Sequence, residues 1–391
     1  MQRRRKLAVM NAVERQPTQP ALVPVRIGHE TARNRIGLAP LHTGLVSAHG
    51  IPTEKFEEFH DFYASMQLGI VFIGGVAVSP SGRTSARSAT LHTSEAASAI
   101  AASVRRIRAR GAVPIIQLMH AGRQANPREI GSRIVAPSAI PCPVVGFTPD
   151  EVTRADIRQI IDAFVTSAAL AKDAGASIIE LHAAHGYLLA GFLSPYSNKR
   201  TDEYGSTAHG RRRLLIEILR ETATIENIHV GVRISGDEHV AGGLTASDMP
   251  DTIRALEGAG ACYVSIAAGV YASDDRIMPP RSLGEAVNAS LGKVAKSSTT
   301  LPILLAGNIT TLQSANELIR TDSADVLLMG RSLLADPYLL PKSLTSEAAS
   351  IQPCTMSTLC KYHSRGFPHI ACPHNQLLSG WLRSSIRASR L

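Results

Sequence analysis

The segment "ELHAAHGYLL", residues 180–189, places His182, His185 and Tyr187 directly after an apolar run, residues 176–179. The apolar run is typical of a buried strand, so these side chains are expected where that strand ends. Imidazoles can hydrogen-bond an oxygen atom of a bound molecule, and a tyrosine hydroxyl can donate a proton. The spacing therefore predicts a site that grips an oxygen atom and delivers a proton beside it.

Two other interpretations apply to the histidine pair. His182 and His185 can be structural residues with satisfied hydrogen bonds, or they can be two ligands of a zinc ion. Zinc needs further ligands, and no third or fourth ligand is evident at the neighbouring predicted strand ends. The other polar residues at those strand ends favour the catalytic interpretation.

The elements that position these side chains can be read from short apolar runs. Most of the runs are apolar nearly throughout, as in parallel strands that are covered on both faces. Eight such runs predict strands: residues 35–41, 70–78, 113–119, 177–181, 229–234, 262–267, 303–306 and 325–329.

Helical patterns lie between the predicted strands. The clearest covers residues 154–174, with a capping box of Thr153 and Asp156 before it and Gly175 after it. Two further helix starts are predicted, by Thr245 with Asp248 and by Thr310 with Gln313.

Strand followed by helix, about eight times over, predicts an α/β chain with a single (β/α)8 barrel. A doubly wound open sheet is the alternative, and it is disfavoured because no G-x-G-x-x-G follows any predicted strand. We expect a flexible basic N-terminus (1–23), the barrel (24–345) and a short C-terminal extension (346–391).

In a barrel of this kind, functional groups lie beyond the C-terminal ends of the strands. Glycines after the last two strands, with Arg331, would suit a phosphate, and Gln117 with Arg233 would suit a flat heterocycle with several carbonyls. These features describe an enzyme that binds flavin mononucleotide (FMN). The residues at the predicted strand ends are His42, Gly75, Gln117, His120, Arg123, Arg233, Gly307, Asn308, Gly330 and Arg331.

The segment "IIELHAAHGYLLAGFLSPYSNKRTDEYG" resembles the signature of the old yellow enzyme family, the FMN-dependent NADH:flavin oxidoreductases. The resemblance covers about residues 24–380. The "HTG" at 42–44 and the C-terminal cysteines are similar to the branch that contains 2,4-dienoyl-CoA reductase and trimethylamine dehydrogenase. Supporting segments are "NRIGLAPLHTG" (34–44), "QLMHAGRQA" (117–125), "VAPSAIP" (135–141), "VRIS" (232–235) and "MGRSLLADP" (329–337).

The resemblance implies a role for each matching residue. His182 and His185 would hold the substrate oxygen, and Tyr187 would donate the proton. Tyr271 and Arg276 are candidate substrate contacts. The cofactor contacts would be Pro40, Leu41, His42, Gly75, Gln117, Arg233, Gly307, Asn308, Gly330 and Arg331.

The implied reaction is reduction of an activated C=C bond, as in an α,β-unsaturated carbonyl, by hydride from flavin N5, with NAD(P)H as the transient reductant. Alternatives are flavin-dependent oxidation of a small substrate, by dehydrogenation or demethylation, and a non-catalytic FMN-binding barrel. For single residues, packing is an alternative role for His120, and pairing with Asp336 is one for Arg331. Asp237, Glu238 and His239 are expected to cap a loop.

Three cysteines, Cys354, Cys360 and Cys372, follow the barrel with five and eleven residues between them. Related iron–sulfur proteins carry C-x2-C-x2-C here, but Ser357 occupies the middle position, and a serine alkoxide is a poor cluster ligand. A lost cluster is therefore favoured over a cluster with an unusual ligand or a zinc site that uses His363 or His374. Because the chain stops at Leu391, electrons are expected to enter and leave at the FMN itself.

Composition restricts the partners. Of 391 residues, 44% are hydrophobic and 19% charged, and the formal charge of +9 is scattered apart from Arg3-Arg4-Arg5-Lys6. We expect a small-molecule substrate and no nucleic acid, with a homo-oligomer left open. No apolar stretch reaches the ~18 residues that span a membrane, and no signal peptide is evident, so a cytoplasmic protein is expected.

Overall fold

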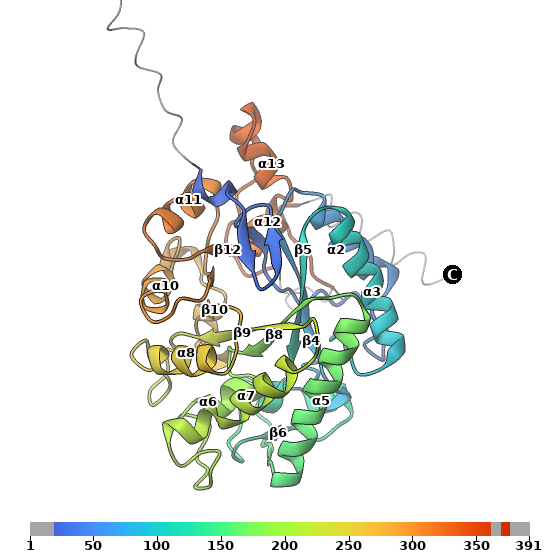
Figure 1. The fold of residues 1–391 in the computed structure, drawn as a ribbon, viewed down its shortest axis with the longest axis vertical. Helices are drawn as coiled ribbons and strands as arrows, with labels where there is room; N and C mark the ends of the chain where they lie inside the picture. The colour runs from blue at the N-terminus through green and yellow to red at the C-terminus, as the bar shows by residue number, and fades with distance from the viewer. Residues whose placement is uncertain (1–18, 361–368, 376–391) are drawn as a thin grey trace, which may run out of the picture.

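The computed structural model describes residues 19–360 and 369–375. Eight parallel strands form a closed barrel in the order β10-β11-β12-β3-β4-β5-β8-β9 (Figure 1). The predicted (β/α)8 barrel is confirmed, because each predicted strand segment overlaps one barrel strand; two of the strands extend past their predicted ends. The strands are β3 (Ile36–Leu38), β4 (Ile70–Ala77), β5 (Val113–Met119), β8 (Ile178–Ala183), β9 (His229–Ser235), β10 (Val264–Ala267), β11 (Ile303–Ala306) and β12 (Val326–Met329).

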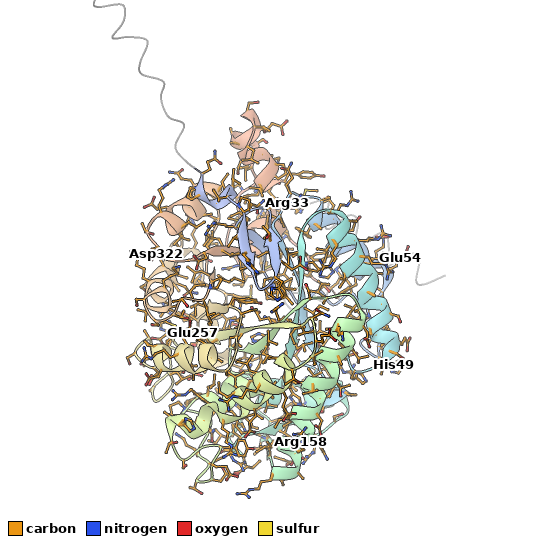
Figure 2. All side chains as sticks on the ribbon, in the orientation of Figure 1. Arg33, His49, Glu54, Arg158, Glu257 and Asp322 are labelled. Carbon is orange, nitrogen blue, oxygen red and sulfur yellow. The ribbon has the colours of Figure 1, made fainter. Side chains whose placement is uncertain are left out.

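Helices surround the barrel and turn their charged faces outward. Arg158, for example, is exposed on a long helix and pairs with Asp162 and Glu221 (Figure 2). None of the helices in the described ranges is long and apolar enough to cross a membrane. The helices are α2 (Glu54–Ala64), α3 (Ser94–Ala109), α4 (Pro127–Ile130), α5 (Arg154–Asp173), α6 (Leu188–Leu193), α7 (Ala208–Ala223), α8 (Met249–Gly258), α9 (Asp274–Ile277), α10 (Ala289–Lys296), α11 (Leu312–Arg320), α12 (Arg331–Ala335) and α13 (Leu339–Ser343).

The interior of the barrel changes from apolar to polar along the strands. Alternate residues of a strand face the same side, so Val113 and Ile115 of β5 precede Gln117 on one face. In β8 the same alternation places Ile178 below Glu180. Val113, Ile115 and Ile178 belong to one buried apolar cluster, whereas Gln117 and Glu180 are buried polar groups.

Two small sheets were not predicted. The hairpin of β1 (Val25–Ile27) and β2 (Glu30–Ala32) adds Ile27 and Ala32 to the apolar cluster inside the barrel. The second sheet pairs β6 (Val135–Ala136) with β7 (Asp150–Glu151). Strands of two or three residues are too short to show a periodic pattern.

One predicted helix start is confirmed and two are misplaced. Thr153 and Asp156 form the capping box of α5. The box of α11 is made by Thr311 and Ser314, because the hydroxyl of Thr310 donates to Glu285 instead.

The start predicted from Thr245 is wrong by three residues, because the N-cap of α8 is Asp248. The backbone N–H and hydroxyl of Thr245 both donate to Asp248, but α8 begins only at Met249. The pair therefore closes a turn that precedes the helix.

Candidate active site

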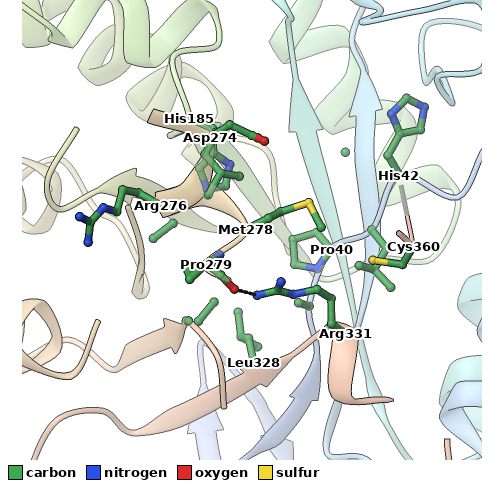
Figure 3. Close-up of a pocket in the computed structure, with 18 of the residues that line it drawn as sticks. Pro40, His42, His185, Asp274, Arg276, Met278, Pro279, Leu328, Arg331 and Cys360 are labelled. Atoms are coloured by element: carbon green, nitrogen blue, oxygen red, sulfur yellow. Dashed lines mark hydrogen bonds between the residues drawn. The ribbon is translucent and has the colours of Figure 1, made fainter. Parts of the chain in front are cut away.

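A cavity of about 590 Å³ opens at the C-terminal ends of the strands (Figure 3). Its walls bring together residues from the first and last strands of the barrel, as the closed topology requires. The predicted site residues that line it are Pro40, Leu41, His42, Gly75, Gln117, His182, His185, Tyr187, Arg233, Tyr271, Arg276, Gly307, Asn308, Gly330 and Arg331.

Hydrogen bonds hold the ring of His182 and the backbone of His185 in place. His182 lies within β8, one position further than predicted, and its Nδ1 accepts the N–H of Ala184 at 3.2 Å. His185 follows the strand with φ +60°; its N–H donates to Ser235 Oγ at 2.9 Å and its carbonyl accepts from Gln124 Nε2 at 2.9 Å. The ring centroids of His182 and His185 are 5.2 Å apart.

Both imidazoles are neutral at physiological pH. Burial lowers the pKa of His185 to about 3, and the positive charge of Arg233 acts in the same direction. Burial, His185 and Arg233 together hold the pKa of His182 well below its usual value. Since Nδ1 of His182 accepts a hydrogen bond, the single proton of that ring lies on Nε2 and is available as a donor.

Tyr187 is the third member of this group. Its hydroxyl oxygen lies 3.2 Å from that of Tyr271, and its ring stands edge-on to His182 with centroids 4.9 Å apart. Burial raises the pKa of Tyr187; the hydrogen bond with Tyr271 opposes this and the charge of Asp274 adds to it. The phenol therefore keeps its proton at neutral pH.

The floor of the cavity is polar. Gln117 Nε2 donates to Glu180 Oε1 at 2.6 Å, and the Tyr263 hydroxyl donates to Glu180 Oε2 at 3.1 Å. Arg233, from the neighbouring strand, lines the cavity above this pair. Burial lowers the pKa of Arg233, whereas Glu180 acts in the opposite direction.

A second polar region lies at the ends of β11 and β12. Arg331 Nη2 donates to the Pro279 carbonyl at 2.8 Å (Figure 3). It also donates to Asn308 Oδ1. Gly307 has φ +143°, and a Cβ there would lie 2.7 Å from Asn288 Nδ2, so this position requires glycine. The alternative pair of Arg331 with Asp336 does not form, since Asp336 binds Lys342 at 2.7 Å.

Three unsatisfied donors test whether this cavity fits FMN. Nε and Nη1 of Arg233 and Nη1 of Arg331 are buried and have no hydrogen-bond partner within the described residues. Buried guanidinium groups are normally hydrogen-bonded, so such donors indicate a ligand with acceptors at both places. The carbonyls of an isoalloxazine ring and a phosphate are acceptors of these two kinds, and the cavity fits the cofactor.

Other residues of the predicted strand ends have structural roles. His120 is buried outside the cavity lining, where its Nδ1 accepts from Gly122 N at 3.1 Å. Arg123 donates to the carbonyls of Ile140 and Pro141 and lies over the ring of Tyr196.

The acidic residues after β9 brace a loop, as expected. Glu238 accepts from Ser194 Oγ at 2.6 Å and from Leu244 N at 2.8 Å. Asp237 accepts from the backbone N–H of His239 at 2.7 Å.

Two of the C-terminal cysteines, Cys354 and Cys360, lie near Arg331. Cys354 and Cys360 line the cavity, and Cys372 is buried. Residues 19–360 and 369–375 contain no group of three or more His, Cys, Asp or Glu that could hold a metal ion. His374 interacts with Thr355 at 2.9 Å, and His363 lies outside the described residues.

Sequence reasoning missed several residues of this site. Gln124 and Ser235 hold the backbone of His185, and Glu180 with Tyr263 supports the floor. Glu180 could have been recognised from the sequence, because a carboxylate within an apolar strand segment needs a hydrogen-bond or charge partner. The hydrogen bonds of Gln124 and Ser235 left no signal, since both connect residues at least 50 positions apart.

Comparisons with known proteins agree with this geometry. The model of the NADH:flavin oxidoreductase / NADH oxidase family matches residues 22–347. An NADPH dehydrogenase of Halalkalibacterium halodurans is 34% identical over 312 residues, which are 79% of this chain and 89% of that protein. An NADH oxidase of Thermoanaerobacter brockii is 32% identical over 84% of this chain, and the match spans 51% of that longer protein.

A solved structure shares the fold. The complex of 2-naphthoyl-CoA reductase with 2-naphthoyl-CoA has a TM-score of 0.88 and 24% identity, over 93% of this chain and 58% of that one. The family match covers most of the chain and includes every strand of the barrel. The chain therefore belongs to the NADH:flavin oxidoreductase / NADH oxidase family, the FMN-dependent oxidoreductases of the old yellow enzyme type.

Proposed function

We propose that this chain is an NAD(P)H-dependent reductase of activated C=C bonds, such as those of small α,β-unsaturated carbonyl compounds. Bound FMN supplies the hydride-transfer chemistry. The observation that carries the proposal is the grouping of two neutral imidazoles and a protonated phenol in one cavity with Gln117 and Arg233. The name of the Halalkalibacterium relative supports NADPH as the reductant.

His182 and His185 would bind the carbonyl oxygen of the substrate. Each neutral ring can donate one hydrogen bond, and His182 presents its Nε2–H because Nδ1 is already occupied. Donors held in fixed positions stabilise negative charge that develops on this oxygen, which lowers the electron density at the β-carbon.

Tyr187 would protonate the α-carbon. Its raised pKa keeps the proton on the oxygen at neutral pH, and the hydroxyl of Tyr271 holds it in place. Proton transfer by a positioned side chain typically contributes about 10²–10⁴-fold to a rate. Tyr271 and Arg276 would complete the wall of the substrate pocket.

Three groups of residues would hold the cofactor. Gln117 and Arg233 would bind the pyrimidine ring, and Arg331 with Gly307, Asn308 and Gly330 would bind the phosphate. Pro40, Leu41, His42 and Gly75 would shape the remaining wall. A cytoplasmic location fits this reaction, because NAD(P)H is kept reduced there.

One observation favours a second function. The carboxylate of Asp274 lines the same cavity, and its charge contributes to the raised pKa of Tyr187 (Figure 3). A cationic amine bound in this cavity would therefore have a negative partner. Flavin-dependent oxidation of such an amine is therefore the second candidate.

Anaerobic stopped-flow mixing separates the two functions. The purified protein should show flavin absorption, lose it rapidly with NADPH, and regain it with 2-cyclohexen-1-one. Rapid bleaching by a primary or tertiary amine with little response to NADPH would favour oxidation instead. A protein that neither retains nor takes up FMN would refute both functions.

A further inference from the structure

The carboxylate of Glu180 is fully buried inside the barrel and does not line the cavity. It lies two residues before His182 on the same face of β8, one layer beneath the site. Its two oxygens accept separate hydrogen bonds, from Gln117 Nε2 at 2.6 Å and from the Tyr263 hydroxyl at 3.1 Å. Burying a carboxylate is costly, so such a group needs partners of this kind.

The barrel makes room for one of these partners at Gly231. Gly231 of β9 pairs in register with Glu180 of β8. A Cβ at Gly231 would lie 2.1 Å from the ring of Tyr263, which a real side chain cannot do. The missing side chain therefore lets the tyrosine ring pass over β9 and reach Glu180 on β8, and any larger residue would displace it.

The carboxylate also decides which way the Gln117 amide faces. An ionised carboxylate can only accept, so the NH₂ of Gln117 must point toward Glu180. The other atom of the amide, Oε1, is turned toward the cavity beside Gly75, where an added Cβ would lie 3.3 Å from it. The floor thus presents an acceptor from Gln117 next to the two Arg233 donors that have no hydrogen-bond partner among the described residues.

Glu180 also places a carboxylate beneath this floor: burial raises its pKa, whereas Arg233, Gln117 and Tyr263 favour its charged form. His182 and Arg233 are directly paired on neighbouring strands, and Glu180 is two residues before His182. The guanidinium and the carboxylate interact electrostatically, and both are buried. Charges in a buried site are weakly screened, so the charge of Glu180 reaches a ligand bound on Arg233.

We infer that Glu180 is a positioning residue that orients the Gln117 amide and offsets the charge of Arg233. Through these two effects it lowers the reduction potential of bound FMN. The inference rests on the proposed function. Reduction adds negative charge to the ring system of FMN, and a fixed anion close to Gln117 and Arg233 would oppose that change. The same anion keeps Gln117 in the orientation that accepts a hydrogen bond from the ring.

The test compares the potential of bound FMN in wild type, E180Q and Y263F, by photometric titration against a redox dye. E180Q removes the negative charge, so the potential should rise. The affinity for reduced FMN relative to oxidised FMN should increase about tenfold, which corresponds to ~30 mV for a two-electron couple. Y263F removes a hydrogen bond but keeps the charge, so the potential should fall by a smaller amount.

Opposite shifts separate this role from a purely structural one. A structural role would lower the melting temperature and the FMN affinity of both variants without moving their potentials in opposite directions. E180D, which keeps the carboxylate, should have a potential closer to wild type than E180Q. An unchanged or lower potential in E180Q overturns the inference.

If E180Q does not fold, the potential of FMN in Y263F still tests the inference. In that case, a lower potential in Y263F supports the inference, and an unchanged or higher one overturns it. Wild-type protein that holds FMN and is bleached by NADPH, together with variants of unchanged potential, would refute this inference alone. Wild-type protein that takes up no FMN would refute it together with the proposed function.

Discussion

The hydroxyl oxygens of Tyr187 and Tyr271 lie 3.2 Å apart, although the residues are 84 positions apart in the chain. The contact joins the loop after β8 to the loop after β10 over the same cavity. One phenol can therefore fix the direction of the other. Under the proposed function, Tyr187 is the proton donor and Tyr271 is the residue that positions it.

Phe variants of this pair should differ in effect. Tyr187→Phe should slow reoxidation by 2-cyclohexen-1-one about 10²–10⁴-fold, because the proton donor is lost. Tyr271→Phe removes only a neutral hydrogen bond and should slow the same step by about tenfold or less. Stopped-flow measurement should show that reduction by NADPH stays close to wild type in both variants. Equal losses in the two variants would contradict this assignment.

The histidine pair should make substrate binding insensitive to pH. The folded pKa of His185 is about 3 and that of His182 is also lowered, so neither ring gains a proton as the pH falls from 8 to about 5. Substrate Kd, measured by the perturbation of flavin absorption, should be flat over this range. A rise in Kd centred near pH 6.5 would show that these rings titrate normally.

The effect of replacing His182 on the rate of substrate reduction should depend on whether the new side chain keeps a hydrogen-bond donor. His182→Leu removes a fixed hydrogen-bond donor and should lower the rate of substrate reduction about 10²–10³-fold. His182→Asn keeps an N–H donor and should retain more of the rate. Equal rates for the Leu and Asn variants would argue for a packing role of this ring.

Arg331 should contribute directly to cofactor affinity. Its buried Nη1 has no partner in the described part of the chain, so a bound phosphate would gain a charge-assisted hydrogen bond. Arg331→Gln should weaken FMN binding about 10–100-fold, as for loss of a hydrogen bond to a charged group of about 1.5–3 kcal/mol. Fluorescence titration of apoprotein with FMN measures this, and Arg320→Gln on the outer surface is the control.

Acid stability should depend on His60. This ring is buried, its Nδ1 lies 2.7 Å from the Phe56 carbonyl, and burial lowers its pKa to about 4. Since the unfolded pKa is about 6.5, the unfolded chain binds the extra proton first. The stabilisation is complete above pH 6.5 and is lost as the pH falls toward 4.

The slope of unfolding free energy against pH checks this sign. One such histidine contributes about 1.4 kcal/mol per pH unit within that window. His60→Gln cannot take up the proton, so its slope between pH 6.5 and 4.5 should be smaller. His49→Gln changes an exposed ring and should leave the slope unaltered. A slope that is the same in His60→Gln and wild type would contradict the assignment.

The three C-terminal cysteines should be dispensable for flavin binding. Ser357 stands where a cluster would need a thiolate, and a serine oxygen keeps its proton at neutral pH. A variant with Cys354, Cys360 and Cys372 all changed to Ser should keep the flavin spectrum. Metal analysis of wild type should find no stoichiometric iron. If wild type contained iron and showed a broad visible absorption, and the variant lost both, the protein would instead hold a cluster.

The sequence by itself determined the barrel and the level at which its chemistry lies. Apolar runs of strand length alternate with capped helices, and parallel strands in a closed barrel place their ends on one rim. Local spacing was also sufficient for the group of His182, His185 and Tyr187, because these residues lie at the end of one strand or directly after it.

Only the tertiary structure decided which residues meet across the barrel. Periodicity shows the direction of a side chain along its own strand, but not which side chain lies opposite. Tyr263 reaches Glu180 across 83 positions because Gly231 leaves space for its ring. The positive φ of His185 is likewise held by Ser235 and Gln124 from other elements. Such contacts depend on packing between distant segments, and no local pattern encodes them.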